Sequence, residues 1–290
     1  MEPKAYYNEI DPYAAQWLRN LIAAGHIASG DVDERSIEDV NPDDLRGYTQ
    51  CHFFAGIGVW SHALRLAGWP DSRPVWTGSC PCQPFSAAGK SGGFDDERHL
   101  WPAFHHLISQ RRPPVVFGEQ VASKDGLAWL DLVQTDLEGA DYAAAAVDLC
   151  AAGVGAPHIR QRLFWVADTS SGGRQPEPVV RSARLRGSQN VAEKQIQQFG
   201  ADGSGPCGMG HSNSGHASPT NGQWRDVDWL LCRDERWRPV EPSTFPLAYG
   251  ATARVGRLRA YGNAIVPQVA AEVIEAYMRT HAEAVMAEMT

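Results

Sequence analysis

Residues 78–86 (GSCPCQPFS) follow a short apolar run at 75–77 and interrupt it with glycine, serine and two prolines. This pattern indicates a strand that ends in a loop, where α/β proteins commonly hold reactive side chains. Cys82 lies within the loop, and its thiolate could attack an electrophilic carbon if cationic or dipolar neighbours lower its pKa. The local sequence equally allows a buried cysteine that acts as a small hydrophobe, or Cys80 and Cys82 as half of a metal site.

Strand-like runs alternate with helix-spaced runs along the chain. The former lie at 5–10, 51–54, 75–77, 115–117, 143–149 and 162–167, and the latter at 12–22, 60–67, 101–110 and 127–137. Residues 42–45 indicate one further short helix. This alternation predicts an α/β fold with a doubly wound sheet. A chain of 290 residues can bury one large core with a modest second lobe.

Composition limits where the protein works. No apolar run has membrane-spanning length and no secretory start is visible, so we expect a cytoplasmic protein without a membrane partner. Six cysteines are too few for a disulfide scaffold. The net charge of −8 argues against indiscriminate nucleic-acid binding, although arginines cluster at 160–186 and 254–259 and could form a local basic face.

Two acidic residues follow or occupy strand-like runs near the amino terminus. Glu9 lies near the end of a run that precedes a helix with Pro12 in its first turn, and a carboxylate there commonly accepts hydrogen bonds from a ribose. Neighbouring Asp11 could instead cap the helix. Asp31 follows a second turn, and it could equally belong to a surface loop. Later in the chain, Gly56 and Gly58 form a Gly-x-Gly turn that would let a ligand approach the backbone and the start of a helix.

Five motifs together resemble those of the cytosine-C5 DNA methyltransferase family. They are FAGIG at 54–58, PCQPFS at 81–86, GEQV at 118–121, PHIRQR at 157–162 and GNAIV at 262–266. The resemblance covers most of the chain except about 169–245. It implies a Rossmann-like methyltransferase sheet and an enzyme that methylates C5 of cytosine in duplex DNA, with S-adenosylmethionine as methyl donor and S-adenosylhomocysteine as product.

The order of the segments departs from that family. Residues 7–11 and 30–32 resemble the ribose and adenine segments, which in the family follow the glycine-rich strand, yet here they precede it. The sheet can keep its spatial order if 33–50 cross from an edge strand back to the centre. If the helix at 60–67 stays on its usual face, the crossover to the strand at 75–77 becomes left-handed, against a strong rule. The sequence leaves this choice open.

The resemblance assigns the chemistry to four residues. Cys82 would add to C6 of cytosine, and Glu119 would provide a proton or hydrogen bond at N3. Arg162 and Arg160 would hold the O2 edge. Alternatively, the glutamate could be a strand-end cap, and the arginines could be solvated side chains that contact phosphate. Two departures from the family pattern are Gln120 in place of asparagine and His158 in place of glutamine, both of which keep hydrogen-bonding side chains.

Several residues are expected to bind the cofactor by the same resemblance. Glu9 would bind the ribose hydroxyls and Asp31 the adenine amino group. The complete set is Glu9, Ile10, Asp31, Val32, Phe54, Gly56, Ile57, Gly58, Pro81, Asn263 and Val266. Val266 could also simply pack in the core.

DNA contacts are expected from a loop and from a second lobe. Residues 86–98 are similar to the family's mobile loop, which closes over DNA around an extruded base, although a plain linker is the alternative. Residues 169–245 would form a small irregular target-recognition lobe, with 1–168 and 246–290 forming the catalytic domain. Residues 169–245 could instead be an insertion that recognises no DNA sequence. The expected DNA-binding residues are Gln83, Ser86, Lys90, Arg98, Arg236 and Arg238.

We expect no metal, because Cys207, His211, His216 and Cys232 match structural zinc spacing poorly. The expected partner is double-stranded DNA, a cognate restriction endonuclease is a second candidate, and the protein should act as a monomer. Compact size and permuted order favour a phage origin. The alternatives are an RNA cytosine-C5 methyltransferase and a catalytically silent DNA-binding relative.

Overall fold

A computed structural model describes residues 4–81, 100–156, 160–169, 228–231, 237–240 and 262–288; the segments 228–231, 237–240 and 282–288 are described as backbone only. The chain divides into two compact units. The first is Met1–Cys150, Gln161–Gly172 and Thr252–Thr290, and the second is Ala151–Arg160 and Gly173–Ala251.

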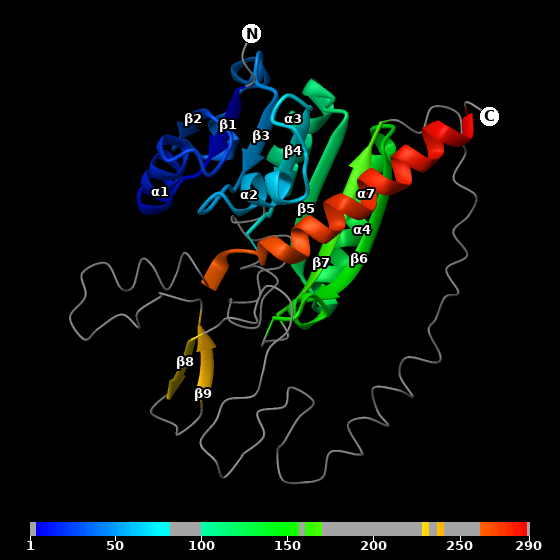
Figure 1. Cartoon of the computed structure of the whole chain (residues 1–290). Coiled ribbons are helices and arrows are strands. Elements are labelled where there is room, and N and C mark those ends of the chain that lie inside the picture. The colour runs from blue at the N-terminus through cyan, green and yellow to red at the C-terminus, as the bar shows by residue number, and fades with distance from the viewer. Residues whose placement is uncertain are drawn as a thin grey trace. The chain divides into compact units, whose positions relative to one another are not determined.

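The first unit contains seven described strands and five α-helices (Figure 1). The strands are β1 (Ala5–Asn8), β2 (Gly30–Asp33), β3 (Gln50–Phe53), β4 (Val75–Gly78), β5 (Val115–Val121), β6 (Ala143–Cys150) and β7 (Gln161–Asp168). The helices are α1 (Pro12–Ala23), α2 (Val59–Leu66), α3 (Trp101–Arg111), α4 (Lys124–Gly139) and α7 (Pro267–Glu288), with 3-10 turns η1 (Ile37–Asp39) and η2 (Pro42–Leu45).

The strands form one sheet in the order β2-β1-β3-β4-β5-β7-β6. The first five are parallel, and β7 runs antiparallel to both β5 and β6. The amino-terminal strands β1 and β2 therefore lie beside the strand that leads into the glycine turn. This confirms the prediction that the displaced segments return to their place in the sheet.

Helix α1 begins where the sequence suggested. Asp11 caps it, because the Oδ1 atom accepts hydrogen bonds from the backbone N–H groups of Tyr13 (2.8 Å) and Ala14 (3.2 Å), and Pro12 occupies the first turn. The capping interpretation of Asp11 is therefore correct. Leu18 is fully buried and packs with Tyr7 of β1.

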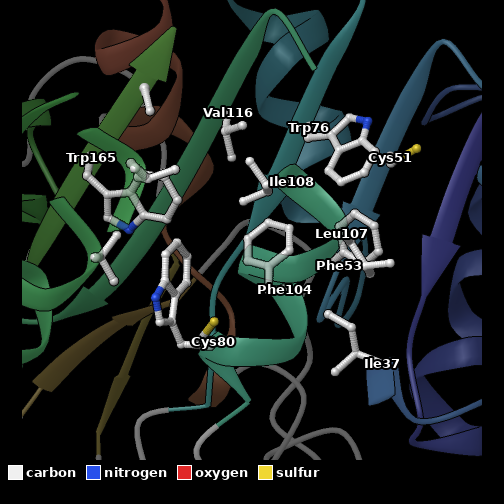
Figure 2. Close-up of a cluster of buried hydrophobic side chains, with 14 of the residues drawn as sticks. Ile37, Cys51, Phe53, Trp76, Cys80, Phe104, Leu107, Ile108, Val116 and Trp165 are labelled. Atoms are coloured by element: carbon white, nitrogen blue, oxygen red, sulfur yellow. The ribbon is translucent and has the colours of Figure 1, made fainter. Parts of the chain in front are cut away.

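One face of the sheet is covered by α3, α4 and the η1–η2 crossover. Figure 2 shows Phe104 and Ile108 of α3 pointing toward side chains of β3, β4 and β5. Phe53 lies 5.0 Å from both Trp76 and Phe104, measured between ring centroids. Such aromatic pairs each add about 0.5–1.5 kcal/mol beyond the burial of their area. This face supplies the larger of the two described core clusters.

The opposite face is covered by α1, α2 and α7. Ser61 of α2 places its Oγ 3.0 Å from the hydroxyl oxygen of Tyr7 and accepts the backbone N–H of Ala28 at 3.2 Å. Tyr277 of α7 meets Phe117 of β5 edge to face at 5.4 Å. Helices α1 and α2 therefore lie on the same side of the sheet.

This arrangement decides the handedness that the sequence left open. The β3–α2–β4 and β4–α3–β5 connections proceed in the same direction across the sheet, yet α2 and α3 lie on opposite faces. The two connections therefore have opposite hands. The β1–α1–β2 connection runs across the sheet in the opposite direction, and its helix lies on the same face as α2. Reversing both the direction and the face leaves the hand unchanged, so β1–α1–β2 and β4–α3–β5 have the same hand, which is the common right-handed one. The β3–α2–β4 crossover is thus left-handed.

The second unit contains η5 (Ala151–Val154) and two antiparallel strands, β8 (Asp228–Leu231) and β9 (Trp237–Val240). The predicted hairpin at 226–245 is confirmed in this pair of strands. In the described part of the chain, no helix combines the length and apolar character that crossing a bilayer requires.

Candidate active site

Glu119 and Arg162 form an ion pair at the carboxyl end of β5. The Nε atom of Arg162 lies 2.8 Å from Oε1 of Glu119, and the two side chains are 24% and 10% exposed. They belong to neighbouring antiparallel strands, where Glu119 is opposite Phe164 and Arg162 is opposite Val121. The sequence separates the two residues by more than forty positions, and the sheet brings them together as one charged pair that is largely shielded from solvent.

Strand β4, which leads into the Pro81 loop, is the neighbour of β5 in the sheet. Gly78, the last residue of β4, is in register with Gly118, so the chain leaves β4 one residue before the level of Glu119. Cys80 is 6% exposed, and burial raises the pKa of its thiol, which keeps it protonated and unreactive. Pro81 ends the described segment. Cys82, the predicted nucleophile, lies outside the described residues, as do Gln83, Ser86, Lys90 and Arg98.

The glycine turn after β3 receives a carboxylate from β1. The Oε2 atom of Glu9 accepts the backbone N–H of Gly56 at 2.7 Å, and its Oε1 atom accepts the N–H of Asp11 at 2.9 Å. The structure therefore brings Glu9 to the glycine turn, as predicted.

The turn leaves room for a ligand. Phe54, Gly56 and Gly58 have φ values of 52°, 55° and 80°. A Cβ atom placed on Gly56 would meet no atom within 4 Å, so that side of the turn is open. Ile57 lies between the two glycines and is half-buried. Ile10 is 66% exposed at the same edge of the sheet, an unusual position for a large aliphatic side chain. An open turn, a fixed carboxylate and an exposed apolar side chain fit a nucleoside-bearing cofactor.

Asp31 lies farther from this turn than the sequence suggested. Its carboxylate is 2.5 Å from Nζ of Lys4 and accepts the hydroxyl of Tyr48 at 2.6 Å; these hydrogen bonds lower the pKa of Asp31. In the strand register it is level with Tyr6, about two residues, or roughly 7 Å, before the end of β2. Val32 is half-buried and packs against the core cluster beside α1. Asp33 is the acidic residue level with the end of β1.

A cavity of about 410 Å³ lies along this edge of the sheet. It is lined by Tyr6, Arg19, Asp31, Val32, Asp33, Glu34, Arg35, Asp44 and Tyr48. Asp33 accepts hydrogen bonds from Nε and Nη2 of Arg35 at 2.7–3.1 Å and from the Tyr6 hydroxyl at 2.7 Å. The sequence signal for these residues is only an acidic run, which is typical of any solvated surface.

The remaining predicted residues are spread over both units. Arg160 has a left-handed φ of 28° and belongs to the second unit, so it is described apart from Glu119. Asn263 is exposed and Val266 is half-buried just before α7. Arg238 lies in β9, where only the backbone is described, and Arg236 lies outside the described residues.

Gln120 turns away from the Glu119 side of its strand and is 1% exposed. Its Oε1 atom accepts the N–H of Val121 at 3.0 Å, and its Nε2 atom has no hydrogen-bond partner among the described residues. The longer side chain at this position, where the family has asparagine, therefore bonds to its own strand.

The described residues contain no group of three or more His, Cys, Asp or Glu side chains placed to hold a metal ion. The cysteine and histidine residues considered for zinc (207, 211, 216 and 232) lie outside the described residues.

Sequence reasoning missed one polar contact of the site. The indole Nε1 of Trp60 donates to Oγ of Ser79 at 3.0 Å, joining the helix after the glycine turn to the loop before Cys82. The apolar pattern of α2 marks Trp60 only as a core residue, and no sequence signal distinguishes its N–H group.

Comparisons with known proteins agree with this geometry. Residues 70–199 match the family model described as C-5 cytosine-specific DNA methylase. The Type II methyltransferase M.HhaI of Haemophilus parahaemolyticus is 36% identical over 90 residues, which is 30% of this chain and 28% of the relative. The Type II methyltransferase M.AplI of Arthrospira platensis is 33% identical over 104 residues, covering 35% and 29%.

The matched region thus spans less than a third of the length of these curated relatives. Among solved structures, the Dnmt2 methyltransferase of S. pombe aligns over 60% of this chain and 53% of its own, with 13% identity and a TM-score of 0.37. A likeness at that level carries no argument about function.

Proposed function

Because residues 70–199 match the C-5 cytosine-specific DNA methylase family model, we propose that this chain is a member of that family and transfers a methyl group from S-adenosylmethionine to C5 of cytosine in duplex DNA. The observation that carries the proposal is the Glu119–Arg162 pair, 2.8 Å apart, at the sheet edge where the Pro81 loop begins. A shielded carboxylate fixed by a guanidinium beside a Pro-Cys loop suits proton delivery to a base held in the site.

In this proposal the thiolate of Cys82 forms a bond to C6 of the cytosine ring, and Glu119 delivers a proton or hydrogen bond to N3. Addition at C6 makes C5 nucleophilic, so that C5 can take the methyl group. When bound, S-adenosylmethionine supplies the methyl cation equivalent. Loss of the C5 proton to a solvent water or hydroxide and expulsion of the Cys82 thiolate then restore the aromatic ring. Arg162 orients the Glu119 carboxylate, and together with Arg160 it would stabilise charge at O2.

The glycine turn and Glu9 would hold the cofactor. Glu9 would accept the ribose hydroxyls, while Phe54, Gly56, Ile57 and Gly58 would contact the methionine and adenosine portions. The open side of Gly56 and the hydrogen bond from its N–H to Glu9 support this assignment. Exposed Ile10 would pack on the adenine ring. Asp31, Val32, Pro81, Asn263 and Val266 complete the proposed set.

Duplex DNA is the proposed substrate, and the target base must leave the stack because a thiolate cannot reach C6 inside a duplex. Residues 169–245 would read the sequence around it, and the expected phosphate and base contacts at 83–98, 236 and 238 belong to the same proposal. We also propose that the protein acts as a monomer in the cytoplasm and has a partner restriction endonuclease.

The experiment is transfer of tritiated methyl groups to duplex DNA, with tRNA as a parallel substrate. Wild-type protein should label duplex DNA, and Cys82→Ala should abolish labelling without changing the midpoint of thermal unfolding. If only tRNA is labelled, the substrate is RNA and not duplex DNA. Undiminished transfer by the Cys82→Ala variant would refute the nucleophile, and absence of transfer by folded wild-type protein would indicate a silent relative.

Cofactor binding has its own test. Glu9→Ala removes the acceptor of the Gly56 N–H and of the ribose hydroxyls, so the dissociation constant for S-adenosylmethionine should rise at least about tenfold in calorimetry. Exposed Glu138 of α4, which lies outside the cavity lining, provides a control, since Glu138→Ala should leave that constant within about twofold. Equal affinities for wild type and Glu9→Ala would contradict the ribose assignment.

A further inference from the structure

Trp60 joins the helix that follows the glycine turn to the loop that precedes Cys82. It is the second residue of α2, two positions after Gly58, and its indole Nε1 lies 3.0 Å from Oγ of Ser79. Ser79 is the first residue after β4 and lies three positions before Cys82. One hydrogen bond therefore links the expected cofactor site to the segment that carries the expected nucleophile.

The donor end of this bond is held firmly. Trp60 is 4% exposed, and its ring stacks on Phe117 at 6.2 Å and meets Phe164 edge to face at 6.1 Å, measured between centroids. These two rings lie two positions before Glu119 on β5 and two positions after Arg162 on β7. The same packing that places the Glu119–Arg162 pair thus fixes the direction in which the indole N–H points.

The start of α2 is also anchored on the cofactor side. The N–H of Gly56 donates to Glu9 at 2.7 Å, and Oγ of Ser61 lies 3.0 Å from the Tyr7 hydroxyl oxygen. The position of α2 on the sheet is therefore set by the contact of Ser61 with β1 and by the contact of Trp60 with Phe117 of β5. A helix held at both sides is a rigid support for the loop at Ser79.

We propose that Trp60 and Ser79 form a positioning contact that fixes the loop leading to Cys82 relative to the cofactor turn. This inference rests on the proposed function, because that function makes Cys82 the nucleophile. Misplacement of a nucleophile by a fraction of an ångström slows attack without changing how tightly the substrates bind. Loss of one neutral hydrogen bond should lower kcat about fivefold.

The test compares Trp60→Phe, which removes the N–H together with part of the indole packing, with Ser79→Ala, which removes only the acceptor. Each should lower kcat for methyl transfer about fivefold while the dissociation constant for S-adenosylmethionine stays unchanged. The thermal midpoint should fall more in Trp60→Phe than in Ser79→Ala, because only the former leaves a cavity. The double variant should be no slower than either single one, because both remove the same bond. Exposed Ser72→Ala and half-buried Trp17→Phe are the matched controls and should behave as wild type.

A second readout needs neither DNA nor cofactor. The rate at which iodoacetamide alkylates Cys82, followed by peptide mass spectrometry across pH, should change about equally in W60F, S79A and the double variant. If wild-type protein does not methylate but this shared change is present, the proposed function fails and the positioning contact stands. Unchanged kcat and alkylation in both single variants, or effects that add in the double variant, would overturn the positioning contact.

Discussion

Glu119 makes an ion pair with Arg162 on a neighbouring strand, and this explains how a carboxylate can stay near the base without drifting into solvent. The Nε atom of Arg162 makes the 2.8 Å contact with Glu119. The Nη1 atom already donates to the carbonyl oxygen of Gln161 at 2.7 Å. The Arg162 guanidinium is thus held through Nε and Nη1, and it can orient the Glu119 carboxylate.

At this residue scale we predict that Glu119→Gln lowers kcat for methyl transfer at least about 100-fold, because the amide cannot deliver a proton to N3 of cytosine. The amide still accepts the hydrogen bond from Arg162, so the thermal midpoint should change little. Single-turnover transfer of tritiated methyl groups and thermal unfolding measure the two quantities. Glu138→Gln, on the exposed side of α4, is the control. A fall of less than about threefold would exclude proton delivery by Glu119.

Elements that are far apart in the chain meet through positions where only glycine fits. Gly118 of β5 lies directly opposite Trp165 of β7, and a Cβ atom at Gly118 would overlap the indole ring. We predict that Gly118→Ala lowers the free energy of unfolding by about 2–3 kcal/mol, measured by urea denaturation, because neither strand can move away. Gly139→Ala at the end of α4, where space is open, should be neutral or slightly stabilising. Similar values for both variants would show that β5 and β7 adjust freely.

The crossover from β2 to β3 exists because the segments are permuted, and Arg35 ties it to the sheet in addition to its buried apolar residues. Arg35 bonds Asp33 at 2.7 Å and Asp44 at 2.9 Å, which ties η2 to the end of β2. Since Arg35 is 44% exposed, we predict that Arg35→Ala lowers the free energy of unfolding by only about 1 kcal/mol.

The exposed pair Arg46–Asp43 offers a comparison on the same segment. Both of its side chains are more than two-thirds exposed, so Arg46→Ala should change the free energy of unfolding by less than about 0.5 kcal/mol. Urea denaturation of the two variants side by side measures the difference. Equal losses would mean that the crossover is held by its apolar residues rather than by Arg35.

Motifs in the sequence predicted most of the elements, and their order alone revealed the permutation. Each strand-turn-helix unit has a local signal, so β1, α1, β3 and α2 could be recognised one by one. The face on which α2 lies could not, because it depends on Ser61 reaching Tyr7 and on Trp60 reaching Phe117 across long separations. The sequence could not give the register of Asp31 either, because the offset between neighbouring strands has no local sequence signal.

At the scale of the whole molecule, the two faces of the sheet differ in polarity. The η1–η2, α3 and α4 face is packed mainly with aromatic and aliphatic side chains. The α2 face carries buried polar groups, among them His52 and Thr77, whose Nδ1 and Oγ1 atoms are 2.8 Å apart. His52 stacks on Tyr7 at 4.9 Å, and its Nε2 atom has no partner among the described residues. A proton on that nitrogen would therefore be a buried charge without a counterion.

Burial lowers the pKa of His52 to about 3, below its ordinary value of 6.5. A group whose pKa falls on folding stabilises the protein above its unfolded pKa and loses that contribution as pH decreases toward the folded pKa. We therefore predict that the free energy of unfolding falls by about 2 kcal/mol between pH 6.5 and 5.0. Asp31 and Asp33, whose pKa values are also lowered, start from 3.8 and so act below this window.

Urea denaturation at several pH values measures this slope. His52→Gln keeps a hydrogen-bonding side chain and cannot take up a proton, so its stability should be nearly constant from pH 6.5 to 5.0 even if it is lower at neutral pH. Exposed His26→Gln should retain the wild-type slope. If His52→Gln and wild type lose stability in parallel, a different buried group takes up the proton on unfolding, and the polar side of the core is not what limits the protein in acid.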